Sequence, residues 1–380
     1  MSGSVRWSGD SRTAREIGQQ PDTWIRVADV VRWARPEIGE LVGAALSGAG
    51  ARIVLTGAGT SAFIGEVVAR DLANHLGRPV EAIATTEIVA DPRAVVVDDR
   101  PILLVSFARS GNSPESVAAA ELLHRLAPRL WHLVLTCDPR GQLARQWSDA
   151  ENAVVVALPD EVNDRGFAMT SSFTGMALAA LLAFGLDVDV EALARAGAEV
   201  LDGAADRASA IAGAKPARLV FLGSGPLRGL AREAALKCLE LTRGEVVGIA
   251  DSALGFRHGP KSVLDDRTIA VVFRSVDPHA RKYDEDIARE LVRSLGEERV
   301  VVVGGDDGAE LGGARSWPVP SPPGVPVAVW ALLAVIAAQS TALACSLALG
   351  LTPDNPFPGG EVNRVVRGVV IHEFDPPEVS

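Results

Sequence analysis

The sequence predicts an α/β protein made of two tandem copies of one unit. Each copy is expected to be a mostly parallel β-sheet with helices on both faces, in a flavodoxin-like three-layer αβα arrangement. Three apolar motifs recur in the same order, so that Gly57 matches Gly223 at an offset of 166 and Val105 matches Val272 at an offset of 167. Short Val/Ile/Leu runs also alternate with Ala-rich helical stretches, which is typical of parallel sheets covered by helices.

The individual elements follow in chain order. Residues 13–46 have the spacing of one or two amphipathic helices. Strands are expected in "RIVL", "PILLVSFARS" and "HLVLTCDPRG", and again in "FLGSGPLRG", "TIAVVFRS" and "RVVVVGGDDG". Apolar helices end both units, and a Pro/Gly-rich loop leads to a predicted final strand, "GVVIHEF". The predicted N-terminal helical segment, first unit, second unit, and C-terminal loop and strand are residues 1–45, 46–200, 201–351 and 352–380.

Composition restricts the class of protein. A formal net charge of −11 disfavours a nucleic acid or an anionic membrane as the partner. Cys137, Cys238 and Cys345 are far apart and lie among apolar residues, which predicts buried thiols in a reducing compartment. The first residues, "MSGSVRWSGDSRTARE", have no apolar core of the kind a secretory signal needs. We therefore expect a cytoplasmic protein.

One segment offers a different interpretation. Residues 327–351 carry no charge over 25 positions, which is long enough to cross a bilayer. The alternative is a helix buried in the fold, and Gln339, Ser340 and Thr341 interrupt the apolar run. No Lys/Arg cluster flanks the segment, and it matches the apolar helix at the end of the first unit. These features favour a buried packing helix.

A glycine-rich turn follows the first strand, in "TGAGTSAFIGE". Backbone N–H groups at the start of the next helix favour an anion there. "GAGTSA" fits the dinucleotide pattern, for which Glu81 or Glu87 could hold a ribose, but this pattern alone is weakly specific. Thr60 and Ser61 fill the turn with hydroxyls where a third glycine is usual, which favours a small phosphorylated ligand.

The end of the next strand strengthens the phosphate hypothesis. "SFARSGNSPES" places Arg109, Ser110 and Ser113 in one loop, and the carboxyl ends of neighbouring parallel strands line the ligand crevice. Hydroxyls, N–H groups and one guanidinium suit a terminal phosphate. An ordinary polar turn remains the alternative interpretation of such a loop.

Candidate catalytic groups lie in the second unit. In "AREAALKCLEL", Glu233, Lys237 and Glu240 share one helical face, a pattern also typical of a solvated charge stripe. His258, in "GFRHGPKS", has the position of an ordinary exposed loop residue. The other histidines lack ligand spacing, so we predict no metal.

These motifs resemble the twin sugar isomerase (SIS) domain family, and within it the group of tagatose-6-phosphate ketose/aldose isomerases and galactosamine-6-phosphate deaminases. The resemblance covers nearly the whole chain and is most specific in "LELTRGEVVGIADSALGFRHGPKSV" and "DNPFPGGEVNRVVRGV". It is similar also to the isomerase domain of glucosamine-6-phosphate synthase, whose "GTS" and "SQSGET" loops hold the sugar phosphate. The resemblance implies phosphate contacts from Thr60, Ser61, Ser110 and Ser113, with Arg109 as a cation that the synthase loop lacks.

The same resemblance implies roles for the second-unit residues. Glu240 would be the base that moves a proton between adjacent sugar carbons, and Lys237 would orient it or stabilise the enolate-like oxygen. His258 would open the sugar ring, reaching the site from the partner subunit of a homodimer. In the C-terminal loop, Glu361, Asn363 or Arg364 would meet the C2 substituent.

The resemblance therefore implies a cofactor-free enzyme that acts on a hexose or hexosamine 6-phosphate. Deamination of galactosamine 6-phosphate to tagatose 6-phosphate and ammonia is the predicted reaction, and plain ketose/aldose isomerisation is the alternative. A non-catalytic sugar-phosphate-binding regulator is a second alternative, although about 45 residues before the first unit show no DNA-reading helix pair. An NAD-dependent enzyme is a third.

Overall fold

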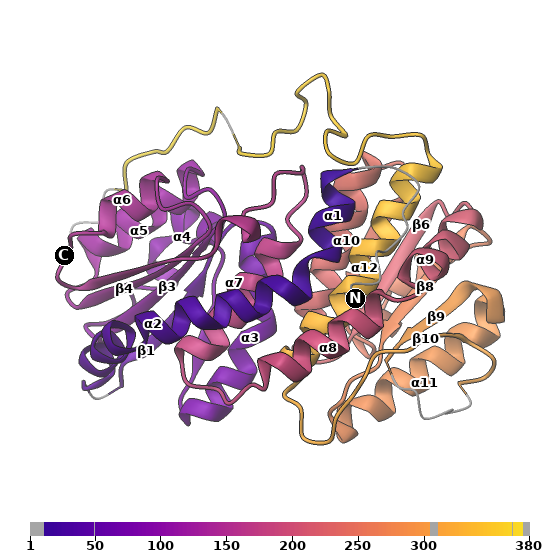
Figure 1. Ribbon diagram of the computed structural model, residues 1–380, viewed down its shortest axis with the longest axis horizontal. Coiled ribbons are helices and arrows are strands. Elements are labelled where there is room, and N and C mark those ends of the chain that lie inside the picture. The colour runs from indigo at the N-terminus through magenta and orange to yellow at the C-terminus, as the bar shows by residue number, and fades with distance from the viewer. Residues whose placement is uncertain (1–10, 49, 305–310, 367, 375–380) are drawn as a thin grey trace.

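The protein is described by a computed structural model in which residues 11–48, 50–304, 311–366 and 368–374 are placed (Figure 1). Two parallel five-stranded sheets form its frame. The first sheet has the spatial order β2-β1-β3-β4-β5: Val80–Ala82, Arg52–Thr56, Ile102–Ala108, Leu130–Thr136 and Ala153–Ala157. The second has the order β10-β9-β8-β6-β7: Arg315–Trp317, Val300–Val303, Thr268–Phe273, Arg218–Gly223 and Val247–Asp251.

The α-helices cover both sheets. The helices from α1 to α12 are, in chain order, Arg12–Gly18, Gln20–Leu46, Thr60–Leu76, Thr85–Ala90, Pro114–Leu126, Gln142–Trp147, Ser171–Ala183, Val190–Leu201, Ala204–Gly213, Leu227–Thr242, Pro278–Leu295 and Val327–Ala348. Short 3-10 turns η1 to η5 lie at Pro92–Ala94, Asp160–Val162, Gly255–Arg257, Pro260–Val263 and Glu297–Arg299. The described part of the chain thus has the predicted α/β class.

The two sheets have the same topology. Read in chain order, each unit pairs its first strand with its second and third, and adds the fourth and fifth outside the third. The register repeats as well, since Leu55 pairs with Val105 in the first sheet and Leu222 pairs with Val272 in the second. Leu222 follows Leu55 by 167 residues and Val272 follows Val105 by 167 residues, which is the offset seen in the sequence. The predicted duplication is therefore confirmed at the level of individual strand partners.

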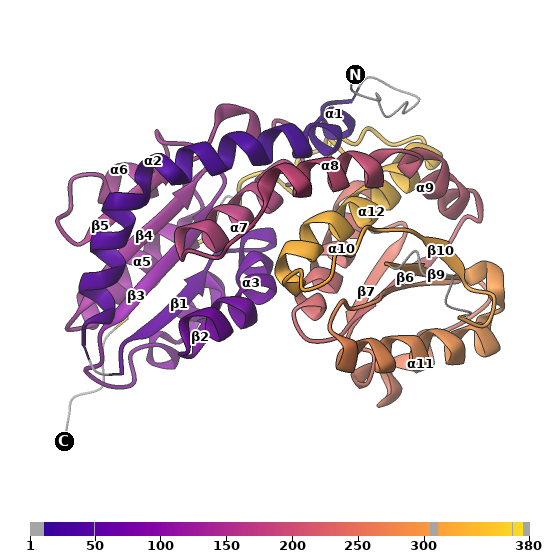
Figure 2. The ribbon, with the colours of Figure 1, turned by 60° about the horizontal axis from the view of Figure 1, so that its bottom comes forward.

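One continuous apolar core joins the units. Buried side chains of α3, α7, α10 and α12 fill the space between the two sheets, where Figure 2 shows these helices side by side. Separate cores lie on the outer faces, under α5 for the first sheet and under α11 for the second. Each sheet is thus covered on both faces, which explains why the central strands read as nearly uninterrupted apolar runs.

The uncharged segment forms α12. It is long and apolar enough to cross a membrane, yet 94% of its most apolar window is buried inside the protein. Two of the three polar residues that interrupt it have partners in the core: Gln20 Nε2 donates to Gln339 Oε1 at 2.8 Å, and Thr341 Oγ1 donates to the Ala337 carbonyl oxygen at 2.8 Å. The Ser340 hydroxyl is buried without a hydrogen-bond partner among the described residues. The helix packs against α9 and α10, as expected for the core helix of a globular unit.

The C-terminal segment after α12 crosses from the second unit to the first, as Figure 1 shows in yellow. The predicted final strand at 368–374 is wrong, because those residues form no strand. Strands need a partner edge, and Val370 and Ile371 are exposed with no strand beside them in the described residues. The apolar run Val369 to Ile371 lies here in a segment without regular secondary structure, beside the first unit.

Candidate active site

The first glycine-rich loop turns from β1 into α3. Gly59 has φ 56°, and a side chain at Gly57 would approach Ser61 Cβ to 2.5 Å, so the turn requires both glycines. No side chain caps the N-terminus of α3, and Thr60 and Ser61 are buried in its first turn. Within the described residues the Thr60 hydroxyl has no hydrogen-bond partner. The Ser61 and Ala62 N–H groups donate to the carbonyl oxygens of Ala58 and Gly59, so this turn offers an anion the positive end of the α3 dipole and two hydroxyls.

The second loop connects β3 to α5. Gly111 turns it with φ 63°, and Ser113 stands at the N-cap of α5 without making a capping hydrogen bond. Asn112 Oδ1 accepts from the Gln142 backbone N–H at 3.0 Å, which holds this loop against the next one. A second helix of the first unit therefore presents an N-terminus with no side-chain cap, in a braced loop.

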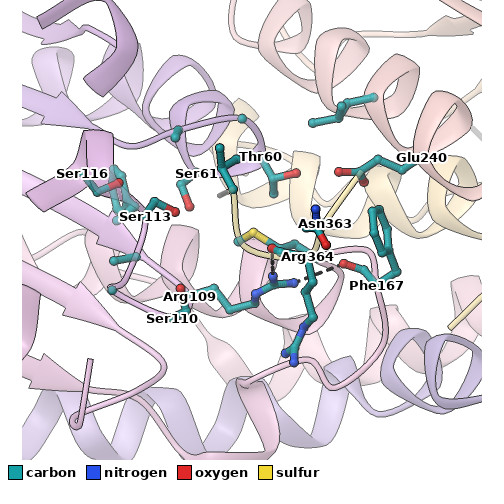
Figure 3. Close-up of a pocket in the computed structure, with 18 of the residues that line it drawn as sticks. Thr60, Ser61, Arg109, Ser110, Ser113, Ser116, Phe167, Glu240, Asn363 and Arg364 are labelled. Atoms are coloured by element: carbon teal, nitrogen blue, oxygen red, sulfur yellow. Dashed lines mark hydrogen bonds between the residues drawn. The ribbon is translucent and has the colours of Figure 1, made fainter. Parts of the chain in front are cut away.

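Both loops line one pocket, which Figure 3 shows in close-up. All five candidate phosphate residues lie on its wall: Thr60, Ser61, Arg109, Ser110 and Ser113. Glu240 from α10 lies on the wall as well, so the second unit contributes a carboxylate to a pocket built mainly by the first. The sequence assigned five residues to the phosphate and three, Lys237, Glu240 and His258, to catalysis. The structure places six of these eight on the wall of one pocket.

The guanidinium of Arg109 makes contacts within the protein and is not simply left free to bind an anion. Its guanidinium is 7% exposed and donates to the carbonyl oxygens of Phe167, at 3.3 Å, and Arg364, at 2.7 Å. Burial lowers the pKa of this guanidinium, although nearby Asp164 and Glu240 oppose the effect. Arg109 therefore ties the phosphate loop to the C-terminal segment while its positive charge stays beside the pocket.

The carboxylate of Glu240 is held by a buried lysine. Lys237 has no exposed surface and contacts Glu240 Oε2, with Glu233 Oε1 at 3.6 Å on its other side. Burial alone would lower the pKa of Lys237, but the charges of Glu233 and Glu240 raise it. Burial raises the pKa of Glu233 to about 8. The solvated stripe is therefore excluded, since two of the three residues are fully buried.

His258 does not line this pocket. It is exposed, in the loop between η3 and η4, and the neighbouring Phe256 is buried in the core on the α11 face of the second sheet. Glu240 lies on α10, whose buried residues belong to the core on the opposite face. The second sheet therefore separates His258 from Glu240 within one chain.

The C-terminal segment lines the pocket through Asn363 and Arg364 (Figure 3). Arg364 contacts the Asp164 carbonyl oxygen, and burial together with the charge of Arg109 lowers its pKa to about 10. Glu361 is exposed and lies outside the pocket lining. Of the three loop residues named from the sequence, two thus lie where a ligand would be.

Sequence reasoning missed the loop at 163–170, which supports this arrangement. The Asp164 carboxylate is buried and accepts from the N–H groups of Thr170, Ser171 and Ser172, at 2.7, 3.0 and 2.9 Å, at the start of α7. Glu16 of α1 accepts from the Gly166 N–H at 3.0 Å, and burial, with Asp164 nearby, raises the pKa of Glu16 to about 7. The signal was the "ND…TSS" spacing, which is a helix-capping pattern.

The matching region of the second unit is already occupied by carboxylates. Gly225 has φ 60°, as Gly59 has φ 56°. Here, however, Asp284 accepts from Ser224 Oγ at 2.5 Å and from the Ser275 N–H at 2.9 Å. Asp277 caps α11 by accepting from two of its backbone N–H groups. The frame is duplicated, but the counterparts of the two loops differ: α10, like α3, has no side-chain cap, whereas α11, unlike α5, is capped by Asp277, and Asp284 occupies the Ser224 hydroxyl.

A dinucleotide or metal site finds little support among the described residues. Glu81, which could have held a ribose, is paired with Arg52 Nε at 2.8 Å, and Glu87 lies exposed in the first turn of α4. No group of three or more His, Cys, Asp or Glu side chains with metal-binding geometry occurs in the ranges that the structure places.

Comparison with known proteins decides the family. Residues 45–185 match the SIS domain. AgaS of Streptomyces coelicolor is 52% identical over 368 residues, 96% of each chain, and an Escherichia coli D-galactosamine-6-phosphate deaminase AgaS is 41% identical over 367 residues, covering 95% of this chain and 96% of the relative. The chain belongs to the AgaS family of SIS-domain proteins. A crystal structure of tagatose-6-phosphate ketose/aldose isomerase from Escherichia coli, 38% identical, superposes with a TM-score of 0.89 over 96% of this chain and 97% of that one.

The AgaS family membership confirms the resemblance stated from the sequence. The SIS match ends at residue 185, before the second sheet begins, whereas the AgaS relatives match across both units. The second unit is therefore part of the AgaS fold, and its repeated topology marks it as a second, more divergent SIS domain.

Proposed function

We propose that this AgaS-family enzyme converts galactosamine 6-phosphate to tagatose 6-phosphate and ammonia. The observation that carries the proposal is the single pocket in which Thr60, Ser61, Ser110 and Ser113 face Glu240. A phosphate group at one end and a proton acceptor at the other are what a sugar-phosphate isomerisation requires. The names of the relatives, deaminases and an isomerase of phosphorylated C6 sugars, support the substrate class.

The phosphate is bound by the first unit in this proposal. The starts of α3 and α5 have no side-chain caps and meet at the pocket, so the positive ends of both helix dipoles and the four hydroxyls are placed to attract phosphate oxygens. Arg109 adds positive charge from behind the loop. In the second unit Asp277 caps α11 and Asp284 accepts from the Ser224 hydroxyl and the Ser275 N–H, so carboxylates stand where a phosphate would need donors.

Glu240 is the proposed base. In the open-chain amino sugar Glu240 takes the proton from C2, the electrons form a C1–C2 double bond, and the C1=O π electrons move to O1, which takes up a proton. The amine then gives up one N–H proton as the C2–N double bond forms, and the same carboxyl returns its proton to C1. The fully buried Lys237 fixes the carboxylate from behind and contributes no surface to the pocket, which favours an orienting role over contact with the sugar oxygen. Lys237 lies nearer to Glu240, which it contacts directly, than to Glu233 at 3.6 Å.

Ammonia follows from the same transfer. Once the proton is on C1, the nitrogen at C2 is part of a ketimine, and water adds to C2 and expels ammonia to leave the ketone. Asn363 and Arg364 are the polar residues among the described C-terminal residues on the pocket wall, and we assign them to the C2 and C3 substituents. If the sugar carries a hydroxyl at C2, the product is a simple aldose/ketose pair.

His258 enters from a second copy of the chain. The second sheet separates it from its own Glu240, and an exposed loop tip is accessible to a partner subunit. A homodimer with shared sites is therefore part of the proposal, with His258 opening the sugar ring. The three free, buried thiols, Cys137, Cys238 and Cys345, support a place in the reducing cytoplasm.

The test is to incubate the purified protein with galactosamine 6-phosphate and no added cofactor or metal. Ammonia and tagatose 6-phosphate should appear in equal amounts, and a chelator should leave the rate unchanged. Background ammonia, together with conversion of tagatose 6-phosphate to an aldose phosphate, would leave isomerisation alone. Absence of both reactions with every hexose and hexosamine 6-phosphate would favour the sugar-phosphate-binding regulator.

A further inference from the structure

The loop that carries His258 has an exposed tip, but its base is fixed by burial and by a backbone hydrogen bond. Two short 3-10 turns, η3 and η4, flank its tip, and His258, Gly259 and Pro260 are all exposed. Phe256, two residues before His258, is fully buried between the second sheet and α11. The His258 N–H donates to the Gly255 carbonyl at 2.9 Å. A small exposed tip therefore stands on a fixed base.

Glu290 of α11 holds both sides of this tip. Its Oε2 accepts from Arg257 Nε at 2.8 Å, and its Oε1 accepts from Lys261 Nζ at 2.5 Å. Arg257 immediately precedes His258, and Lys261 follows it by three residues. The two cations lower the pKa of Glu290, so the bridge is ionised at neutral pH. One carboxylate thus closes a ring around the tip by joining both of its ends to one helix.

This bridge differs from an ordinary surface ion pair. Pairs between exposed, flexible side chains contribute little, because ordering them offsets the attraction. Here the Glu290, Arg257 and Lys261 side chains are only 26%, 28% and 31% exposed, and each carboxylate oxygen has its own cation. Gly259, with φ 123°, has a backbone conformation that a free loop would readily leave. The bridge holds the ends between which this glycine turns.

We propose that Glu290 is a positioning residue that sets where His258 is presented, and that it acts on the active site of the other subunit. The inference rests on the proposed function, in which His258 completes the partner's site. Among the described residues the Glu290 carboxylate pairs with Arg257 and Lys261, neither of which lines the pocket, so its effect on catalysis passes through the loop. Misplacement of a catalytic group by about 1 Å can cost about 100-fold in rate.

The test begins with Glu290→Gln, which keeps the shape and removes the charge. We expect kcat to fall about 10- to 100-fold with KM for the sugar phosphate nearly unchanged, and hydrogen exchange to rise at 255–263. Lys261→Met releases one arm only and should give a smaller loss. Asp286→Asn is the matched control, because Asp286 lies on the same helix and pairs with Arg289 away from the loop. It should leave both readouts unchanged.

Subunit exchange separates positioning from general damage. Glu290→Gln mixed with Glu240→Gln should regain activity, because one site of the heterodimer then has an intact Glu240 and an intact loop. Glu290→Gln mixed with His258→Ala should not, because both changes impair the same loop. The proposal would be overturned if Glu290→Gln had the kcat and the hydrogen exchange of the wild type. It would also be overturned if activity returned on mixing with His258→Ala and not with Glu240→Gln. Wild-type protein that releases no ammonia would instead defeat the proposed function, while hydrogen exchange at 255–263 would still test the clamp.

Discussion

Glu240 and His258 lie on opposite faces of the second sheet. Glu240 is on α10, which packs in the core between the two units, and His258 follows Phe256, which is buried on the α11 side. The two residues also lie toward different ends of this sheet. The helix α10 begins at Leu227, at the end of the sheet where β7 stops and the His258 loop starts, and Glu240 lies about 20 Å further along α10. If both residues serve one reaction, they come from different chains.

This relationship predicts intersubunit complementation. Glu240→Gln and His258→Ala homodimers should each be inactive, and exchange between them should restore activity, because one of the two sites in a heterodimer has both native residues. With random exchange half of the dimers are mixed, so about a quarter of all sites become active, as the arithmetic of pairing requires. Ammonia release after exchange verified by mass measures it. No recovery would place His258 outside the partner's site.

Glu240→Gln tests the base directly. The amide keeps the shape of the side chain and cannot accept the C2 proton, so kcat should fall by about 10² or more with little change in binding. In deuterated water the wild type should incorporate deuterium at C1 of the product and the variant should not. A variant with near-normal turnover would make Glu240 a bystander on the pocket wall.

Ser110→Ala tests the phosphate site. One hydrogen bond to a charged group contributes about 1.5–3 kcal/mol, so KM should rise roughly 10- to 100-fold while kcat changes little. Arg109→Leu should raise KM too, and it should also free the C-terminal segment, because Arg109 donates to the Arg364 carbonyl. Ser148→Ala, at the far end of α6, is the control. Equal wild-type activity on the unphosphorylated sugar would contradict the assignment.

Glu233 predicts a pH dependence of stability. Its pKa is about 8 in the folded protein against 4.5 for an ordinary glutamate, so the folded state binds this proton more tightly than the unfolded chain does. The stabilisation is complete below pH 4.5 and is lost as the pH rises to about 8. Across that window the wild-type free energy of unfolding should fall, relative to Glu233→Gln, by up to about 1.4 kcal/mol per pH unit.

The comparison between wild type and Glu233→Gln matters because Glu16 and Asp284 also have raised pKa values, of about 7 and 6, and add slopes of the same sign. Denaturant titrations from pH 5 to 8 on both proteins isolate the Glu233 contribution. Glu199→Gln, on the exposed face of α8, should follow the wild type. Parallel curves for wild type and Glu233→Gln would mean that Glu233 is ionised in the folded protein.

Much of the fold could be predicted because the residues that recur at a constant offset are those that form the buried strands. The offset of 167 between Val105 and Val272 reappears as the same register against Leu55 and Leu222. Buried parallel strands tolerate few residue types, so their pattern survives divergence. The predicted final strand at 368–374 was wrong because a short apolar run, Val369 to Ile371, does not specify whether a sheet edge is available.

The part of the site that could be predicted is the loop whose backbone conformation itself requires particular residues. Gly57 and Gly59 are required by the turn itself, so the first anion loop is visible in one sequence. Glu16 could not be found, because its function depends on the N–H groups of Arg165 and Gly166, 149 and 150 residues away along the chain. Burial of Lys237 was hidden for the same reason, since the neighbouring unit covers it. Asp164, by contrast, had a local signal, since its carboxylate binds residues 6 to 8 positions further on.

The two units predict one bound phosphate per chain. Both have a glycine with positive φ at the first turn, but Asp284 takes the donors of Ser224 and Ser275, and Asp277 takes the start of α11. A phosphate there would meet two carboxylates in a partly buried site, where repulsion is weakly screened. Calorimetry with inorganic phosphate should therefore give one site per chain, and Ser110→Ala should weaken that site without revealing another. A second site that persists in Ser110→Ala would show that the second unit binds anions despite its carboxylates.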